Sequence, residues 1–424
     1  MAPLTQASKS PNVQLSRRKQ HSRRGLRFKA IILRFLMKIG MVLHGYPFPR
    51  PPLPHFTRFI QPSPSSGATL AVPSLSRCPS ASPRLRNICL HFYTPFNYQT
   101  NSPDSKRWPV VVNFHGGGFT IGCATDDGRW ARIAVETTHA VFVSVDYRLA
   151  PENPFPAAVD DGVDALLYLE ANADAFSLDM TRVSVTGFSA GGNLAVTVPL
   201  RLQHRIMQHQ QLQQQQQQQR KQQPQEQEQH RPESRQHIPD SDMSDDDIGL
   251  VDSNQFLLNG SVSPARSQPY PETPPKIKLL SIFAWYPILD FVTTRETRSS
   301  RSKNPDKCLP DFLTTLFDES YIPDLADRAS PFASPIHASD DILRKGLPAD
   351  IFICMCEWDM LLEEGREFAQ RLEGMGKKVR SMTVAGQRHA WDKSANPLRD
   401  QGSVDAIYRQ SCQEMEFIFE REHK

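Results

Sequence analysis

A serine between glycines stands at residues 187–192 (GFSAGG), where the sequence indicates a sharp turn between two regular elements. The preceding stretch 182–187 (RVSVTG) alternates like a strand, and we expect a helix to begin directly after Ser189. Such a tight turn requires small neighbours, raises the serine hydroxyl above the edge of a sheet and points a helix N-terminus at the reacting atom. We predict that Ser189 is a catalytic nucleophile; the competing interpretation is an ordinary helix-capping serine.

Three consecutive glycines follow another expected strand, in residues 115–119 (HGGGF). Glycines allow the backbone to approach a substrate and to present its N–H groups. We predict that the amides of Gly117, Gly118 and Ala190 hold the carbonyl oxygen as it becomes an anion, and one such donor contributes about 3 kcal/mol in the transition state. A phosphate-binding loop would require a lysine or a GxGxxG spacing, and the segment has neither.

A histidine and an aspartate complete the set of residues needed for acyl transfer. His389 lies in a loop shortly after the last expected strand, and Asp359 follows the strand before it. The chain order Ser, Asp, His is the order found in α/β hydrolases. We predict that His389 is the general base and that Asp359 orients its imidazole.

Other residues compete for these roles. Glu357 and Glu363 are alternatives for the acid, and His337 is the alternative for the base. His115, at the start of the triple-glycine loop, is interpreted as an anchor for that loop. The sequence leaves these alternatives open.

Strands and helices alternate along the chain in a way that positions these residues. Helices are expected at 156–172, after Ser189, at 361–374 and at 403–422. The expected strands are 88–94, 109–114, 141–146, 182–187, 277–284, 350–355 and 378–384. Apolar, β-branched strands alternating with helices indicate a mostly parallel sheet covered on both faces, so we predict an α/β fold over residues 86–424.

The pattern is interrupted at residues 204–275. This segment contains a glutamine-rich run, an acidic run (DSDMSDDD) and a proline-rich run. Such a composition buries too little apolar surface to offset the entropy of ordering. We predict a disordered low-complexity insertion within the catalytic domain.

The first part of the chain is strongly basic. Residues 1–103 carry 15 Lys and Arg and no Asp or Glu, so the overall charge of +3 leaves −12 for the remainder. We predict a disordered basic leader at 1–25, followed at 26–85 by a helix and a Pro/Ser-rich segment. A basic arm of this kind indicates contact with an anionic surface or a targeting segment. The alternative is a disordered leader without a partner.

Residues 28–43 (FKAIILRFLMKIGMVL) form an amphipathic helix in this interpretation. The stretch is too short to span a bilayer and carries Lys29, Arg34 and Lys38. We favour a helix packed near the substrate entrance. One alternative is a helix that lies on a membrane surface and makes peripheral contact with it. The other is a mitochondrial presequence.

The cysteine and histidine spacing argues against other classes of protein. Seven scattered cysteines predict free thiols and a cytoplasmic, reducing setting. No metal-ligand spacing is present, so we expect no metal and no cofactor. The expected partner is a small-molecule ester, with no role for nucleic acid; the oligomeric state is left open.

Three further segments carry a resemblance: 146–152 (DYRLAPE), 155–158 (FPAA) and 286–290 (YPILD). Together with HGGGF and GFSAGGN, they make the chain similar to the hormone-sensitive-lipase-like, HGGG-type carboxylesterases of the α/β-hydrolase superfamily. The resemblance spans about residues 88–420 apart from the insertion. It implies hydrolysis of carboxylic esters without a metal and an N-terminal helical cap over the pocket.

Two departures from the family pattern concern the acid segment, where Met360 replaces a proline and Glu363 stands where an aspartate is common. Within DYRLAPE, Asp146, Arg148 and Glu152 are interpreted as a buried polar scaffold under the oxyanion loop. We predict an esterase for short to medium acyl chains. A non-catalytic receptor or an interaction scaffold on the same fold is the alternative, although relatives with the receptor role have lost the histidine that this chain retains as His389.

Overall fold

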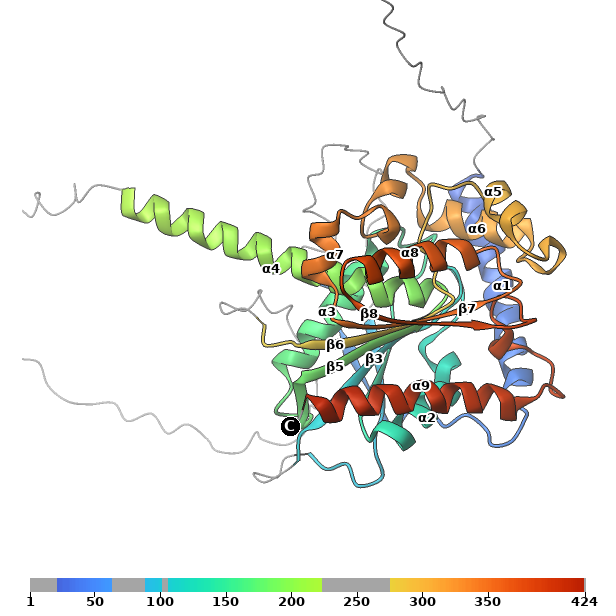
Figure 1. The fold of residues 1–424 in the computed structure, drawn as a ribbon, viewed down its shortest axis with the longest axis horizontal. Coiled ribbons are helices and arrows are strands. Elements are labelled where there is room, and N and C mark those ends of the chain that lie inside the picture. The colour runs from blue at the N-terminus through green and yellow to red at the C-terminus, as the bar shows by residue number, and fades with distance from the viewer. Residues whose placement is uncertain (1–20, 63–87, 101–105, 223–274, 423–424) are drawn as a thin grey trace, which may run out of the picture.

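The protein has an eight-stranded sheet with helices on both faces (Figure 1). The computed structural model describes residues 21–62, 88–100, 106–222 and 275–422. The strands are β1 (Phe56–Ile60), β2 (Ile88–Tyr93), β3 (Trp108–Phe114), β4 (Val141–Asp146), β5 (Leu178–Phe188), β6 (Leu279–Trp285), β7 (Asp350–Cys356) and β8 (Lys378–Val384). Their spatial order is β1-β2-β4-β3-β5-β6-β7-β8.

Most of the sheet is parallel. β2 pairs antiparallel with both β1 and β4, whereas β4, β3, β5, β6, β7 and β8 run parallel to one another. Strand β3 is buried along its whole length, as expected for a parallel strand covered on both faces. The predicted α/β fold is confirmed. The carboxyl ends of β5, β7 and β8 lie at one edge, and the segments that follow them carry Ser189, Asp359 and His389.

Helices cover the two faces of the sheet. α2 (Gly128–Thr138) and α9 (Gln401–Arg421) pack together on one face, and α3 (Ala157–Ala171), α4 (Ala190–Gln222), α7 (Asp340–Gly346) and α8 (Leu362–Gly374) lie on the other. α5 (Arg295–Arg301) and α6 (Asp311–Tyr321) belong to the connection between β6 and β7. Single 3₁₀ turns occur at Ala124–Asp127, Pro305–Lys307, Leu325–Ala329, Pro335–His337 and Trp391–Lys393.

The segment after the first helix contains a strand that the sequence did not indicate. A Pro/Ser-rich segment without a strand was expected here, but β1 pairs antiparallel with β2 at the edge of the sheet, and Phe56 stacks on Phe92 at 4.5 Å between ring centroids. Four of the five residues of β1 (FTRFI) are of types that favour strands, but the run is short and follows several prolines, which indicated an irregular segment. Pairing with β2 completes the strand.

The N-terminal helix α1 (Arg23–His44) is longer than predicted at both ends. Ser22 caps it by accepting a hydrogen bond from the Gly25 amide, and Gly45 follows its last turn. In Figure 1, α1 runs along one side of the molecule beside α6. Among the described helices, none combines the length and the apolar character needed to cross a membrane.

Helix α4 extends well into the predicted insertion. Its residues up to Gln222 are helical, whereas the insertion was expected to begin at residue 204. Glutamine is a good helix former, so the helix continues into the glutamine-rich run. The remainder of the predicted insertion, 223–274, lies outside the described residues, as do 1–20 of the predicted leader and 63–87 of the Pro/Ser-rich segment. The cysteines within the described part of the chain are free thiols.

Candidate active site

Ser189 occupies the turn between β5 and α4 in a left-handed conformation, with φ of +55°. Its amide donates to the carbonyl oxygen of Trp285 at 2.8 Å. The turn tolerates no side chain at its flanking glycines. A Cβ atom at Gly187 would lie 2.1 Å from the Gly191 oxygen, and one at Gly191 would lie 1.9 Å from the Phe114 oxygen. The two glycines therefore allow the serine to stand at the top of the sheet.

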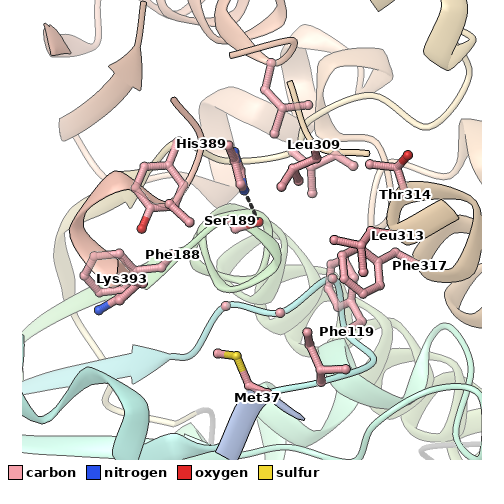
Figure 2. A pocket seen from close by; sticks show the side chains of 18 of the residues that line it. Met37, Phe119, Phe188, Ser189, Leu309, Leu313, Thr314, Phe317, His389 and Lys393 are labelled. Carbon is pink, nitrogen blue, oxygen red and sulfur yellow. Dashed lines mark hydrogen bonds between the residues drawn. The ribbon is translucent and has the colours of Figure 1, made fainter. Parts of the chain in front are cut away.

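The structure brings the three predicted side chains together. His389 Nε2 is 2.8 Å from Ser189 Oγ (Figure 2). Its Nδ1 is 2.5 Å from Asp359 Oδ2. His389 is 7% exposed and Asp359 is 1% exposed. With the Nδ1–H donating to the carboxylate, Nε2 is left to accept the serine proton. This is the arrangement that acyl transfer by a serine requires.

The alternative acids lie elsewhere. Glu357 accepts hydrogen bonds from Lys303 Nζ at 2.9 Å and from the Gly386 amide at 2.8 Å. Glu363 pairs with Arg366 at 2.8 Å on the surface of α8. Each of these carboxylates already has its own cationic or amide partner, and Asp359 is the one that contacts the imidazole.

The other two histidines considered also have separate partners. His337 Nε2 lies 2.9 Å from Asp290 Oδ1. His115 is fully buried, and its ring stacks on Tyr147 at 4.2 Å. The Tyr147 hydroxyl donates to the His115 carbonyl oxygen at 2.9 Å, so this pair holds the start of the triple-glycine loop.

The triple-glycine loop turns tightly beside Ser189. The φ angles of Gly117 and Gly118 are +112° and +57°, and the Gly117 carbonyl oxygen accepts hydrogen bonds from the amides of Thr120 and Ile121. Within the described part of the chain, the amides of Gly117 and Gly118 donate to no protein atom. Both glycines line the same cavity as Ser189. Their N–H groups therefore remain available to an anion.

A polar cluster behind His389 was missed by the sequence analysis. The Tyr286 ring meets the imidazole edge-on at 4.9 Å, and the Tyr286 hydroxyl donates to Asp392 at 2.6 Å. Lys393 lies 2.7 Å from Asp127 and 3.6 Å from Asp392. Burial alone would disfavour the charge on Lys393, but the two carboxylates hold its pKa above the usual value. These residues are far apart in sequence, so no local pattern identifies the cluster.

The predicted scaffold of Asp146, Arg148 and Glu152 is not a single buried cluster. Arg148 Nη2 and Nε both donate to Oδ1 of fully buried Asp161, at 2.6 and 2.8 Å. The Glu152 side chain is 36% exposed and binds Arg34 at 2.8 Å. The expectation was wrong for Glu152 because its turn faces α1 instead of the sheet.

Arg34 ties α1 to the loops beside the nucleophile. Besides Glu152, its guanidinium donates to the carbonyl oxygens of Thr120 and Ala150, both at 2.8 Å. Thr120 belongs to the turn of the triple-glycine loop. The N-terminal helix is therefore fixed directly to the backbone that would hold a developing anion.

A cavity of about 240 Å³ opens onto Ser189 and His389. Its walls are mostly apolar, and α1, α6 and the loop before α6 supply part of them (Figure 2). The side chains concerned include Met37, Met41, Leu309, Leu313, Thr314 and Phe317. None of these residues was identified from the sequence: α6 was not foreseen, and in the predicted N-terminal helix the apolar residues that face the cavity carry no signature of their own.

One buried cation also faces the cavity. Arg298 is 5% exposed, and its guanidinium lies 3.7 Å from Asp318 and 3.9 Å from Glu364. Burial raises the pKa of the Glu364 carboxyl to about 8, so this carboxyl is largely neutral at pH 7. Among the described residues, no group of three His, Cys, Asp or Glu side chains is placed to hold a metal ion.

Comparison with known proteins places the chain among hydrolases. Residues 111–250 and 263–393 match the profile of a family described as alpha/beta hydrolase fold. The esterase LipI of Mycobacterium tuberculosis is 44% identical over 100 residues, which cover 23% of this chain and 31% of that protein. An esterase of Gibberella moniliformis is 24% identical over 315 residues, covering 74% of this chain and 76% of its own.

Solved structures show the same fold. An esterase of Pyrobaculum calidifontis superposes with a TM-score of 0.59 at 22% identity, covering 92% of this chain and 93% of the other. The chain spans about a third of the length of the curated relatives that it matches at roughly 40% identity.

Proposed function

The chain belongs to this α/β-hydrolase family, within its hormone-sensitive-lipase-like carboxylesterase group, and we propose that it hydrolyses carboxylic esters through an acyl-enzyme on Ser189. The observation that supports the proposal best is the buried series of hydrogen bonds from Asp359 through His389 to Ser189, which ends at an apolar cavity. No described feature favours the receptor or scaffold alternatives.

The acylation step uses each of the three side chains once. His389 Nε2 accepts the proton as Ser189 Oγ attacks the ester carbonyl carbon. Asp359 holds the imidazole in the tautomer that can accept this proton and stabilises the imidazolium that forms. The tetrahedral intermediate then collapses, and His389 donates the proton to the leaving alcohol.

Deacylation repeats the sequence with water. His389 removes a proton from a water molecule, which attacks the acyl carbon, and then returns a proton to Ser189 Oγ as the carboxylic acid leaves. In both steps the amides of Gly117, Gly118 and Ala190 hold the oxygen that becomes negative. These donors are fixed by the backbone, so they need no reorganisation when charge develops.

Replacing Gly117 with alanine is expected to lower kcat/KM by about 100-fold or more. The new Cβ atom would lie 2.2 Å from the Ile121 carbonyl oxygen, so the loop must shift and its amides must move. The measurement is the hydrolysis of p-nitrophenyl butyrate, with the thermal unfolding midpoint as a check on folding.

The matched control for this variant is Gly374→Ala, at the end of α8. No atom lies within 4 Å of the position of its new Cβ, so hydrolysis should be unchanged. A folded Gly117→Ala variant that keeps the wild-type kcat/KM would remove Gly117 from the proposed oxyanion hole.

A series of p-nitrophenyl esters tests the proposed substrate class. The cavity is small and is lined by the apolar side chains of Leu313 and Phe317, so kcat/KM should be greatest for short to medium acyl chains and should fall at palmitate. All esters are compared below their solubility limits, with the release of p-nitrophenol as the readout. A kcat/KM that rises steadily up to palmitate would contradict the proposed chain length, and an absence of turnover with every ester would contradict the proposed function.

A further inference from the structure

Helix α1 presents two different faces to its surroundings. The inner face contains the buried residues Leu26 and Ala30, together with Met37 and Met41, which line the cavity above Ser189. Arg34 fixes the same helix to the neighbouring loops. These contacts fix α1 against the cavity, so the orientation of its outer face is fixed as well.

The outer face of α1 is an exposed apolar stripe. Phe28, Ile32, Phe35, Ile39 and Val42 follow one another at steps of four and three residues, which places them on one side of the helix. Their exposed fractions are 66%, 43%, 64%, 49% and 74%. Ile31, Leu36 and Leu43 are also exposed and widen the stripe. The outer face of a helix in a water-soluble protein normally carries polar residues, so a stripe of this length indicates a surface that contacts something else.

Positive charge borders the apolar stripe on both sides. At 100° per residue, Lys29 lies along one edge of the stripe, and Arg27 and Lys38 lie along the other. All three side chains are exposed, and α1 contains no acidic residue. The preceding residues add Lys9, Arg17, Arg18 and Lys19, and no Asp or Glu occurs before Asp104.

The outer face of α1 could contact either a second copy of the chain or a lipid surface, and the positive charge beside the apolar stripe distinguishes between these two partners. In a symmetric pair of α1 helices from two copies of the chain, basic borders would face basic borders, and this repulsion would oppose association. An anionic lipid surface complements the same helix, because the apolar side chains enter the acyl boundary while Lys and Arg contact the headgroups.

We propose that α1 docks flat on an anionic lipid bilayer through the stripe from Phe28 to Val42 and its basic borders. Docking in this orientation brings the cavity side of α1, with Met37 and Met41, close to the membrane surface. Esters dissolved in the bilayer would then reach the cavity along a short path; this consequence rests on the proposed function, whereas the docking does not.

The full-length chain is tested by co-sedimentation with vesicles of phosphatidylcholine alone and of phosphatidylcholine mixed with phosphatidylserine. We expect binding to the mixed vesicles, weaker binding to phosphatidylcholine alone, and release as sodium chloride is raised. The double variant Phe28→Ser, Phe35→Ser should lower the partition coefficient by at least about tenfold. The double variant Lys29→Glu, Lys38→Glu should lower binding to the mixed vesicles and should have little effect with phosphatidylcholine alone.

Phe417→Ser is the matched control, because Phe417 is 64% exposed on α9, another surface helix. It should bind vesicles as the wild type does. The Phe28, Phe35 double variant should keep the wild-type kcat/KM for soluble p-nitrophenyl acetate, which shows that the site is intact. If the wild type hydrolysed no ester yet bound vesicles, the proposed function would fail and the docking would stand.

Two outcomes would overturn the docking proposal. In the first, the wild type stays in the supernatant with both kinds of vesicle, or the double phenylalanine variant binds as tightly as the wild type. In the second, the wild type is a dimer in solution and does not bind vesicles, whereas the Phe28→Ser, Phe35→Ser variant is a monomer. This result would identify the stripe as an interface between two copies of the chain.

Discussion

Ser189→Ala should lower kcat for p-nitrophenyl ester hydrolysis by at least about 10⁴-fold while leaving the fold unchanged. The variant loses the one oxygen that can form the acyl-enzyme, and the remaining amides and binding contacts supply only residual catalysis. Alanine is smaller than serine and keeps the backbone contacts of the turn, including the bond from residue 189 to the Trp285 carbonyl oxygen. Steady-state kinetics and the thermal unfolding midpoint measure the two effects separately.

A fluorophosphonate probe gives a second readout for the same substitution. The probe reacts only with an activated serine, so it should label the wild type and should not label Ser189→Ala. Ser300→Ala is the matched control, since Ser300 is an exposed residue of α5. Undiminished turnover or labelling of the Ser189 variant would show that another residue is the nucleophile.

The second large effect is expected for Asp359→Asn, with kcat reduced on the order of 10³- to 10⁴-fold. An asparagine amide would donate to His389 Nδ1, which favours the tautomer with its proton on Nε2. That tautomer cannot accept the proton of Ser189. KM should change less than kcat, because the aspartate is buried behind the imidazole and does not line the cavity.

Two matched controls separate Asp359 from its neighbours. Glu357→Gln and Glu363→Gln each remove a carboxylate near the end of β7, but these carboxylates pair with Lys303 and Arg366 instead of with His389. Both variants should keep kcat close to that of the wild type. A normal kcat in Asp359→Asn together with a large loss in Glu357→Gln would move the acid role to Glu357.

The position of α1 connects the cavity with the surface of the molecule. A single helix supplies Met37 and Met41 to the cavity, Arg34 to the loop beside the nucleophile, and Phe35 to the exposed stripe. Residues three and four apart on a helix share a face, whereas neighbouring residues point in different directions. Three contacts with different partners can therefore be made by residues within less than two turns of one helix.

The sequence was informative wherever the governing interaction is local. Strand β3 and the parallel strands β4 to β8 follow from apolar or alternating segments of the right length, and the turn at Ser189 follows from glycines that no other residue could replace. Ser189, Asp359 and His389 each follow a predicted strand, so the sequence placed all three residues at one edge of the sheet. A parallel sheet brings the carboxyl ends of its strands together whatever the lengths of the connections between them.

The sequence was less informative about contacts between distant segments. It did not identify β1, the pairing of Glu152 with Arg34, the cluster around Asp392, or the walls that α6 gives to the cavity. Each of these depends on two or more segments that are distant in the sequence and meet only in the folded structure. Their side chains have no periodicity or spacing that refers to the partner.

The sequence by itself therefore determined the α/β sheet and the set of residues that can perform acyl transfer, because hydrophobic periodicity and turn geometry act over a few neighbouring residues. The tertiary structure alone decided the shape of the cavity and which face of α1 remains exposed. Those properties depend on the packing of helices against loops that are distant in the chain, where side-chain shape and burial, not local propensity, select the arrangement.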